Sequence, residues 1–367
     1  MPIGENLAGR GIHDSANNAD QGRFAGAAQA GGIERTTQSS AILFAQGNRV
    51  ELSYAVVTPS ISGTAITAIP NVADRYGLPG LAMKMDINEQ LSFALIYDRP
   101  FGADVVYDAA NPMFGGTLAK ADTHALTALA RYKFDERISV FGGLRAQRAE
   151  GQIHLQGAAY GAASGYDAQL ASDWGIGYVV GAAYEIPDIA LRVALTYNSA
   201  IKHDFDTREN IAPGVVSTTE VKTPQSINLD FQTGIAKDTL LMASIRWAEH
   251  SAFRIKPAAI NTDLVSLDDT TTYSLGVARR FTPEFAASLT VGYEKEGDPL
   301  VSPLAPTNGR KSITLGASYK LSDTVELSGG ISKIWVGDAQ PATGGVGRGL
   351  FTDNSVTAVG LKIAYTF

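Results

Sequence analysis

The chain has 367 residues, enough for two ordinary domains or one large β-barrel. Charged residues make up only 18% of it, and a net charge of -7 without a basic stripe argues against nucleic acid as a partner. It has no cysteine, which excludes disulfides and thiolate metal sites, and no apolar run of about 18 residues that would predict a transmembrane helix.

The N-terminal region ends in a pattern typical of a secretory signal. Ala28-Gln29-Ala30 forms an A-x-A cleavage site before Gly31. Residues 1–23, however, are polar and lack the apolar core of such a signal. Residues 1–30 are therefore interpreted as a signal-peptide remnant or as a disordered polar tail, and the pattern does not choose between them.

Alternating segments follow along the rest of the chain. Large apolar residues occupy every second position in fourteen stretches, from residues 50–56 to residues 359–367, whereas helical periodicity is weak throughout. Small or polar residues fall between the apolar ones. The sequence therefore predicts fourteen strands, each with two sharply different faces.

The connections between these strands alternate in length, which is typical of an outer-membrane barrel with short turns at one end and long loops at the other. An even strand number then puts both termini at the short-turn end. Short connections fall at residues 86–89, 135–137, 186–188, 236–238, 282–284 and 321–323, and long ones near 58–76, 108–121, 151–172, 200–223, 250–270, 295–309 and 337–353.

These features favour an all-β fold in which residues 48–367 form a 14-stranded antiparallel transmembrane β-barrel in a Gram-negative outer membrane. The apolar faces would contact lipid and the polar faces would line a lumen, because only a closed barrel satisfies every backbone group in lipid. A large soluble β-sandwich or a solenoid is the alternative. The last strand would close against the first. The terminal Phe367 resembles the C-terminal signal that the barrel assembly machinery recognises.

Pro100-Phe101-Gly102 interrupts one of the predicted strands, which continues to Tyr107. Proline cannot donate a ladder hydrogen bond, and glycine weakens strand pairing. The sequence therefore predicts a break here, which could leave a hole in the wall or form a bulge at the base of a loop.

Several stretches resemble the FadL family of outer-membrane long-chain fatty acid transporters. The resemblance spans residues 31–367, and three of the clearest stretches are GGIERTTQSSAILFAQGNRVELSYAVVTPSISG, LSFALIYDRPFGADVVY and IRWAEHSAFRI. The family implies a 14-stranded barrel, an N-terminal hatch inside it and a lateral gap at a kink in strand 3, here Pro100, Phe101 and Gly102. This chain differs in having a short N-terminal segment without the family's Asn-Pro-Ala motif.

The resemblance makes residues 31–47 the expected hatch. Ile42, Leu43 and Phe44 would then face the lumen, and Glu34 and Arg35 would pair with charges on the wall. The alternative is a loose periplasmic tail, since chain termini are often poorly ordered.

Candidate ligand contacts follow from the same resemblance. A fatty acid carboxylate could bind a lumen cation, with Arg145, Arg192, Arg246 and Lys362 as candidates, although ion pairs with Glu51, Asp98, Asp230 or Glu326 are an alternative role for them. An apolar capture surface is expected in the loop of residues 151–172. Its candidate residues are Leu155, Tyr160, Tyr166 and Leu170.

The predicted function is inward transport of long-chain fatty acids or similar hydrophobic molecules by a monomer lying among outer-membrane lipid and lipopolysaccharide. No cofactor, metal site or enzymatic activity is expected, because His124, His154, His203 and His250 lack metal-ligand spacing and no nucleophile motif occurs. Two alternatives stay open: a diffusive porin for polar solutes, and an outer-membrane lipid hydrolase. In a transporter residues 31–47 would lie inside the barrel, and in a porin they would lie elsewhere.

Overall fold

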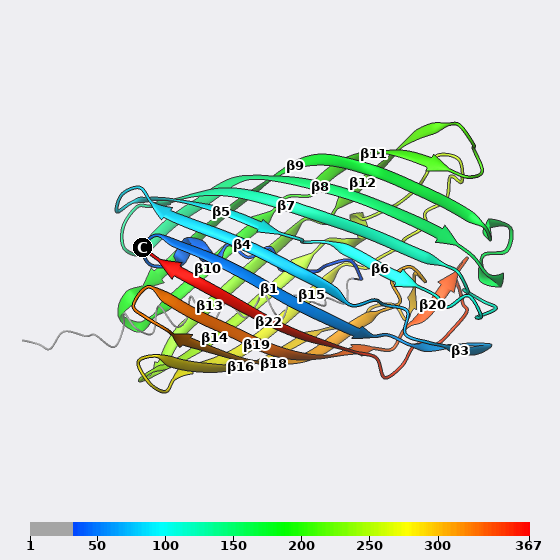
Figure 1. Cartoon of the computed structure of the whole chain (residues 1–367). Coiled ribbons are helices and arrows are strands. Elements are labelled where there is room, and N and C mark those ends of the chain that lie inside the picture. The colour runs from blue at the N-terminus through cyan, green and yellow to red at the C-terminus, as the bar shows by residue number, and fades with distance from the viewer. Residues whose placement is uncertain (1–31) are drawn as a thin grey trace, which may run out of the picture.

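A computed structural model describes residues 32–367, and the expected signal-peptide remnant or tail of residues 1–30 lies outside them. The described chain forms one closed antiparallel barrel of fourteen wall strands, three of which are interrupted (Figure 1). This confirms the predicted fold class. Among the described residues no helix has the length and apolar character needed to cross a membrane.

The wall strands follow one another in chain order around the barrel. They are β1 (Arg49–Ser60), β4 (Tyr76–Asp86), β5 (Leu91–Asp98) with β6 (Gly102–Val106), β7 (Leu118–Lys133), β8 (Ile138–Leu155), β9 (Tyr166–Ile186), β10 (Leu191–Asn198) with β11 (Ile201–Glu209), β12 (Val216–Thr223) with β13 (Ser226–Ala236), β14 (Thr239–Ala248), β15 (Thr270–Arg280), β16 (Phe285–Glu294), β18 (Asn308–Lys320), β19 (Val325–Gly337) and β22 (Ser355–Thr366).

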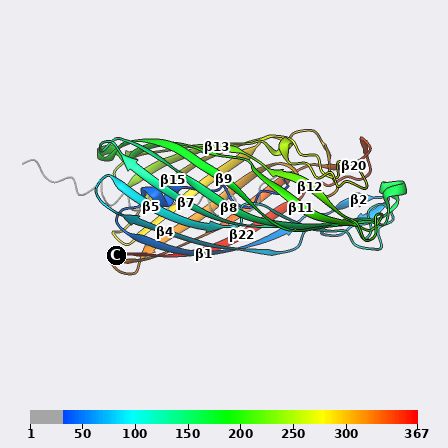
Figure 2. The ribbon, with the colours of Figure 1, turned by 90° about the horizontal axis from the view of Figure 1, so that it is seen from above.

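Short strands and single 3-10 turns lie outside this wall. The short strands β2 (Gly63–Ala65), β3 (Thr67–Ile69), β17 (Leu300–Val301), β20 (Gln340–Thr343) and β21 (Val346–Gly347) belong to the loops, and the turns are η1 (Ala41–Phe44), η2 (Ala158–Ala163), η3 (Pro187–Ile189) and η4 (His250–Ala252). The loop strands gather at the end of the barrel opposite the C-terminus, which Figure 2 shows from a second direction.

The barrel closes where its first and last strands meet. β1 pairs with β22 from Arg49↔Thr366 to Ser60↔Ser355, and its other edge pairs with β4. From Arg49 to Val57 both edges of β1 are therefore paired, which satisfies the requirement for a wall in lipid.

The two faces of the wall are arranged as the alternation predicts for a membrane barrel. Leu52 and Leu361 are 58% and 60% exposed on the outside, whereas the neighbouring Glu51 and Lys362 are each only 3% exposed. A soluble sandwich would have the opposite distribution. The large exposed apolar side chains thus form the lipid-facing surface.

Two of the expected long loops are shorter than predicted. β8 continues to Leu155 and β9 begins at Tyr166, so the loop expected at residues 151–172 covers only the residues between them. Residues 200–223 are mostly the hairpin of β11 and β12. On β11 the charged Lys202, Asp204, Asp206 and Arg208 face outward, which places this extension beyond the lipid-facing belt.

Candidate functional site

The wall is interrupted between β4 and β6. β5 and β6 both pair with β7, at Asp98↔Ala125 and Gly102↔Asp122, but the ladder between β4 and β5 stops at Leu81↔Tyr97. Within residues 32–367 no ladder joins β6 to β4. Toward the loops, a single bridge, Ala73↔Val105, bounds the interruption on its far side. The wall therefore has a local opening, named here the wall opening, between residues 76–80 and β6.

The backbone of the break is hydrogen bonded to a side chain of β7 and to the N-terminal segment instead of to β4. The N–H of Phe101 donates to Thr123 Oγ1 at 2.9 Å, and the same hydroxyl donates to the Phe101 carbonyl at 2.7 Å. On the lumen side, Arg35 N–H donates to the Pro100 carbonyl at 2.8 Å, and Gly102 N–H donates to the Ile33 carbonyl at 2.7 Å. The N-terminal segment thus replaces β4 as the backbone partner of the break.

This N-terminal segment (residues 32–47) lies inside the barrel. Ile42, Leu43 and Phe44 are buried among inward-facing wall residues such as Ala82 and Leu129. The Phe44 ring packs edge-on against Phe141 at 5.8 Å, with the guanidinium groups of Arg131 and Arg192 at 4.3 and 4.5 Å from its centre.

A buried ion pair anchors the segment near the wall opening. Glu34 accepts hydrogen bonds from Arg246 on β14, and both side chains are at most 5% exposed. Arg246 also donates to Asn228 and to Ser226, the latter at 2.9 Å. Because a buried charge needs both a partner and further hydrogen bonds, this network fixes the position of the segment.

A cavity of about 90 Å³ lies on the lumen side of the wall opening. Its lining is largely apolar, with a few charged groups. The apolar part includes Ile61, Val72, Val105, Val336 and Val356, and the charged part includes Glu34, Arg35, Asp104 and Arg310. Such a pocket, apolar with a few polar groups, is the usual form of a small-molecule site.

Polar side chains cross the wall opening on its outer side. Arg99 donates to the Gly77 carbonyl of β4 at 3.0 Å and forms an ion pair with Asp122 of β7. Asp122 also lies 3.4 Å from His124 Nε2, and His124 Nδ1 is 2.7 Å from the Tyr97 hydroxyl. Arg99, which directly follows β5, therefore links the break to the facing end of β4.

The four candidate head-group cations do not form one site. Arg145 donates to Thr127 and Asn198 at 2.8 and 3.1 Å, Arg192 donates to Gln232 at 2.8 Å, and Lys362 lies 3.3 Å from Glu51. Arg246 pairs with Glu34 rather than with a wall carboxylate. Lys362 thus forms one of the ion pairs considered as an alternative role, whereas Arg246 forms an ion pair with Glu34, which was expected to pair with a charge on the wall.

The expected capture residues lie mostly inside the barrel. Leu155 ends β8, and Tyr166 and Leu170 belong to β9; all three are buried in the lumen, so their placement in a surface loop was wrong. The strands extend beyond the lipid belt with apolar residues still facing inward, which is why they seemed to form an apolar loop. Of the four, only Tyr160 lies in the loop, on η2 and half-buried.

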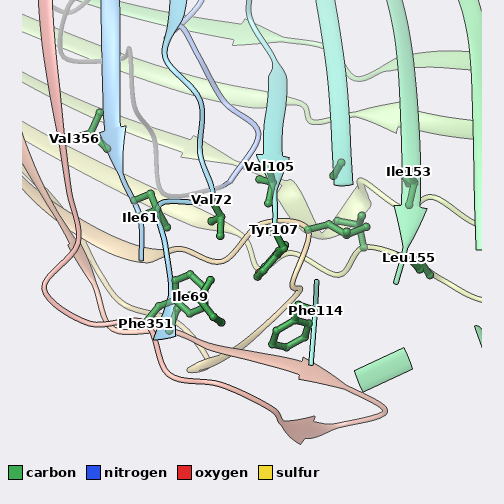
Figure 3. Packing of buried hydrophobic residues seen from close by; sticks show 14 of the residues in the cluster. Ile61, Ile69, Val72, Val105, Tyr107, Phe114, Ile153, Leu155, Phe351 and Val356 are labelled. Atoms are coloured by element: carbon green, nitrogen blue, oxygen red, sulfur yellow. The ribbon is translucent and has the colours of Figure 1, made fainter. Parts of the chain in front are cut away.

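These residues belong to a large apolar cluster, named here the apolar half of the lumen, at the long-loop end. Figure 3 shows its side chains converging from wall strands and loops. Tyr107 packs against Phe114 at 5.1 Å and Phe351 at 6.4 Å, and its hydroxyl donates to the Pro303 carbonyl at 2.8 Å. Phe114 also meets Tyr160 at 6.3 Å.

A carboxylate clamps one loop over this half. Glu209, at the end of β11, accepts from the N–H groups of Ala259 and Ile260 at 2.9 and 3.0 Å and from the Tyr166 hydroxyl at 2.9 Å. Burial acts to raise the pKa of Glu209, but these hydrogen bonds outweigh it and lower the pKa below its ordinary value.

The histidines of the described chain contact tyrosine, aspartate or threonine. His154 lies 3.5 Å from Asp167, His203 lies 3.3 Å from Asp173, and His250 is 3.2 Å from the Thr270 hydroxyl. Within residues 32–367 no group of three or more metal-ligating side chains is arranged to hold an ion.

Sequence reasoning located the break on β5 but missed its other edge. Gly77, Pro79 and Gly80 lie on the end of β4 that pairs with β1 but not with β5 or β6, opposite the break. Proline offers no N–H and glycine weakens a strand, so the same signal that was recognised at Pro100 was present here too.

A closed 14-stranded barrel whose lipid-facing outer surface is apolar defines an outer-membrane β-barrel protein. The family model described as outer membrane protein transport protein (OMPP1/FadL/TodX) matches residues 14–367, and the chain belongs to this family. The resemblance to FadL is thereby confirmed, and the chain is placed among outer-membrane transporters of hydrophobic compounds.

Solved structures share the fold. A Pseudomonas aeruginosa FadL homologue superposes with a TM-score of 0.73 at 17% identity, covering 89% of this chain and 92% of that one. The Pseudomonas putida toluene transporter TodX gives 0.67 at 14% identity, with coverage of 92% and 97%. The Ralstonia pickettii toluene transporter TbuX gives 0.62 at 14%, with 88% and 90%. No curated protein sequence matches the chain.

Proposed function

We propose that the chain carries a hydrophobic small molecule from the cell exterior through the apolar half of the lumen and releases it sideways through the wall opening. The N-terminal segment acts as the hatch that closes the route toward the periplasm. One observation carries the proposal: the β4–β6 ladder is missing where an apolar cavity of about 90 Å³ adjoins the wall.

The lumen supports a sideways route rather than a straight one. Toward the short turns, the interior contains the N-terminal segment and buried ion pairs such as Arg246–Glu34 and Lys362–Glu51. An apolar molecule passing there would have to separate paired buried charges, which is costly. A porin needs an open, water-filled lumen, and the position of residues 32–47 favours the transporter over that alternative.

The similar solved structures suggest which class of ligand to test: they include toluene transporters and a FadL homologue. An apolar lining suits the alkyl chain of a long-chain fatty acid as well as a smaller hydrocarbon, and a fatty acid carboxylate would additionally need a cation. We keep Arg145, which is held by the neutral Thr127 and Asn198, as the proposed head-group contact.

Capture at the cell surface is assigned to the loops over the apolar half. A groove of about 650 Å³ there is lined by residues including Tyr160, Ile260, Leu264 and Leu304. Transport without an enzyme step, by a monomer, stays a prediction, as do contacts with lipopolysaccharide and recognition of Phe367 by the assembly machinery.

The experiment blocks the wall opening with a side chain. Ala103 on β6 lines both the lumen cavity and the groove outside it, whereas Ala121, its direct partner on β7, lines only the outer groove. We expect Ala103→Trp to abolish uptake of radiolabelled fatty acid or toluene by cells lacking their own transporter. Ala121→Trp, expressed at the same surface level, should leave uptake intact.

Two results would contradict the proposal. Equal uptake by both variants and the unaltered chain would exclude the sideways route. No uptake of either compound by the unaltered chain would exclude these ligands.

A further inference from the structure

The side chain of Arg35 occupies the wall opening from the lumen side. Its guanidinium lies 4.4 Å from the centre of the Tyr76 ring on β4 and 3.9 Å from Asp122 on β7. The side chain is only 6% exposed. Its own backbone is held by the hydrogen bond to the Pro100 carbonyl. One residue of the N-terminal segment thus contacts both sides of the interruption.

Arg35 also separates two spaces. The lumen cavity of about 90 Å³ and an outer groove of about 830 Å³ are both lined by Arg35, Tyr76, Ala103 and Asp104. The remaining lining of the two differs: the cavity is largely apolar, whereas the groove is lined mostly by outward-facing residues of β7 to β9 and β11, such as Lys120 and Glu150. These four residues are therefore the partition between inside and outside.

Gly102 provides the space that the guanidinium needs. A Cβ added at this position would overlap the Arg35 guanidinium, and no other group is among its three nearest neighbours. The Gly102 backbone is not in the left-handed region, so a larger residue is not excluded by backbone strain. Gly102 is thus explained by the space that the Arg35 guanidinium occupies and not by the conformation of a turn. This position of the guanidinium, between Tyr76 and Gly102, is named here the seat of Arg35.

We propose that Arg35 is the stopper of the wall opening: its guanidinium, seated between Tyr76 and Gly102 and attracted by Asp122, seals the partition, and passage requires it to leave this seat. A cation stacked on an aromatic ring and paired with a carboxylate is held more firmly than an apolar side chain of the same size, yet it can be released by solvation. This inference rests on the proposed lateral route.

The test uses the absence of cysteine in the chain. Val105→Cys places a single thiol on the lumen cavity but not on the outer groove. The probe is a membrane-impermeant, charged methanethiosulfonate added to the purified protein in lipid nanodiscs. We expect Arg35→Ala to raise the labelling rate at least about tenfold, since that factor corresponds to only about 1.4 kcal/mol.

Gly102→Ala should have the same effect although Arg35 is still present, because the added methyl group displaces the guanidinium. The double variant should label no faster than either single one, since both changes empty the same seat. Glu150→Ala removes a charged side chain that lines only the outer groove, and it should change the labelling rate little.

A second thiol, Ile153→Cys, reports on general loosening. Ile153 is buried in the apolar half but lines neither space. The proposed role of Arg35 would be wrong if neither Arg35→Ala nor Gly102→Ala changed the labelling rate of Val105→Cys. It would also be wrong if the labelling rate of Ile153→Cys rose by the same factor. Labelling needs no transported molecule, so a failure of uptake in the Ala103→Trp experiment is distinguishable from a failure here.

Discussion

The two halves of the lumen are built from the same strands but have opposite chemistry. On β22 the inward-facing residue near the short turn is Lys362, whereas Ala358 and Val356 face inward nearer the loops. On β8 the inward residues change from Arg145 to Ile153. On these two strands the alternation keeps its period of two, and only the inward set changes from charged to apolar.

The wall opening lies at the level where this change occurs. Glu34, Arg35 and Arg246 meet there, next to the apolar cavity. A hydrophobic molecule that has followed the apolar half reaches paired charges at this level, and under the proposed function the lateral exit is the less costly path. The comparison thus explains the position of the exit as well as its existence.

Removing the central cation should produce the largest effect. Arg246→Ala leaves Glu34 buried without its partner, which costs about 3–5 kcal/mol in similar sites. We expect the N-terminal segment to leave the lumen, measured as faster proteolysis within residues 32–47 of the purified barrel. The double variant Glu34→Gln/Arg246→Met removes both charges and should restore much of the protection. Equal proteolysis of single and double variants would contradict the role of the pair.

The apolar half of the lumen should be destabilised by a substitution that leaves a cavity, since its stability depends on packing and not on charge pairs. Phe114 is fully buried, and Phe114→Ala should destabilise this half by about 3 kcal/mol, the lower end of the range for such a truncation, because loops can relax around it. Thermal unfolding followed by near-ultraviolet circular dichroism would measure the loss. Phe114→Leu, which keeps most of the volume, should cost less than about 1.5 kcal/mol. A similar loss in both variants would show that packing at Phe114 is not the cause.

Much of the fold could be predicted because a barrel wall in lipid leaves a local signature. Each strand shows its two faces directly, as Leu52 and Glu51 do, and each short turn separates two strands. The break at Pro100 was visible for the same reason, since a proline inside an alternating segment is a local event.

The interior contacts could not be predicted, because they join residues far apart in sequence. Nothing near Glu34 indicates that its partner is Arg246, more than two hundred residues away. Likewise, Tyr166 and Leu170 were placed in a surface loop because apolar residues beyond the lipid belt give no indication of which way they face. Only the packing of the whole lumen decides between a loop and an extended strand.

The clamp over the apolar half should depend on pH. Because the pKa of Glu209 is lowered in the folded chain, its contribution is complete above its ordinary value of 4.5 and is lost as the pH falls through the lower folded value. Glu209→Gln should weaken the clamp by about 2 kcal/mol at neutral pH, because hydrogen bonds to a charged acceptor are lost. Hydrogen exchange of Ala259 and Ile260 would then be faster in the variant.

At pH 3 the amides of Ala259 and Ile260 should exchange at more similar rates in the unaltered chain and in Glu209→Gln. The intrinsic exchange rate also changes with pH, and comparing the two proteins at the same pH cancels that change. A difference that persists undiminished at pH 3 would mean that the charge of Glu209 does not hold the loop.

The smallest effect should come from an ion pair outside the barrel. Lys202 and Glu220 lie 2.8 Å apart on the outer face of β11 and β12, at about half of their full exposure. Like Arg246 and Glu34, these two residues pair a cation with a carboxylate. Because water already solvates both groups, forming the pair contributes little free energy to folding. We expect Lys202→Gln to leave thermal unfolding and the proteolysis of residues 32–47 unchanged within error. A loss as large as that of Arg246→Ala would mean that charge pairing itself, rather than burial beside the wall opening, decides how firmly the lumen is closed.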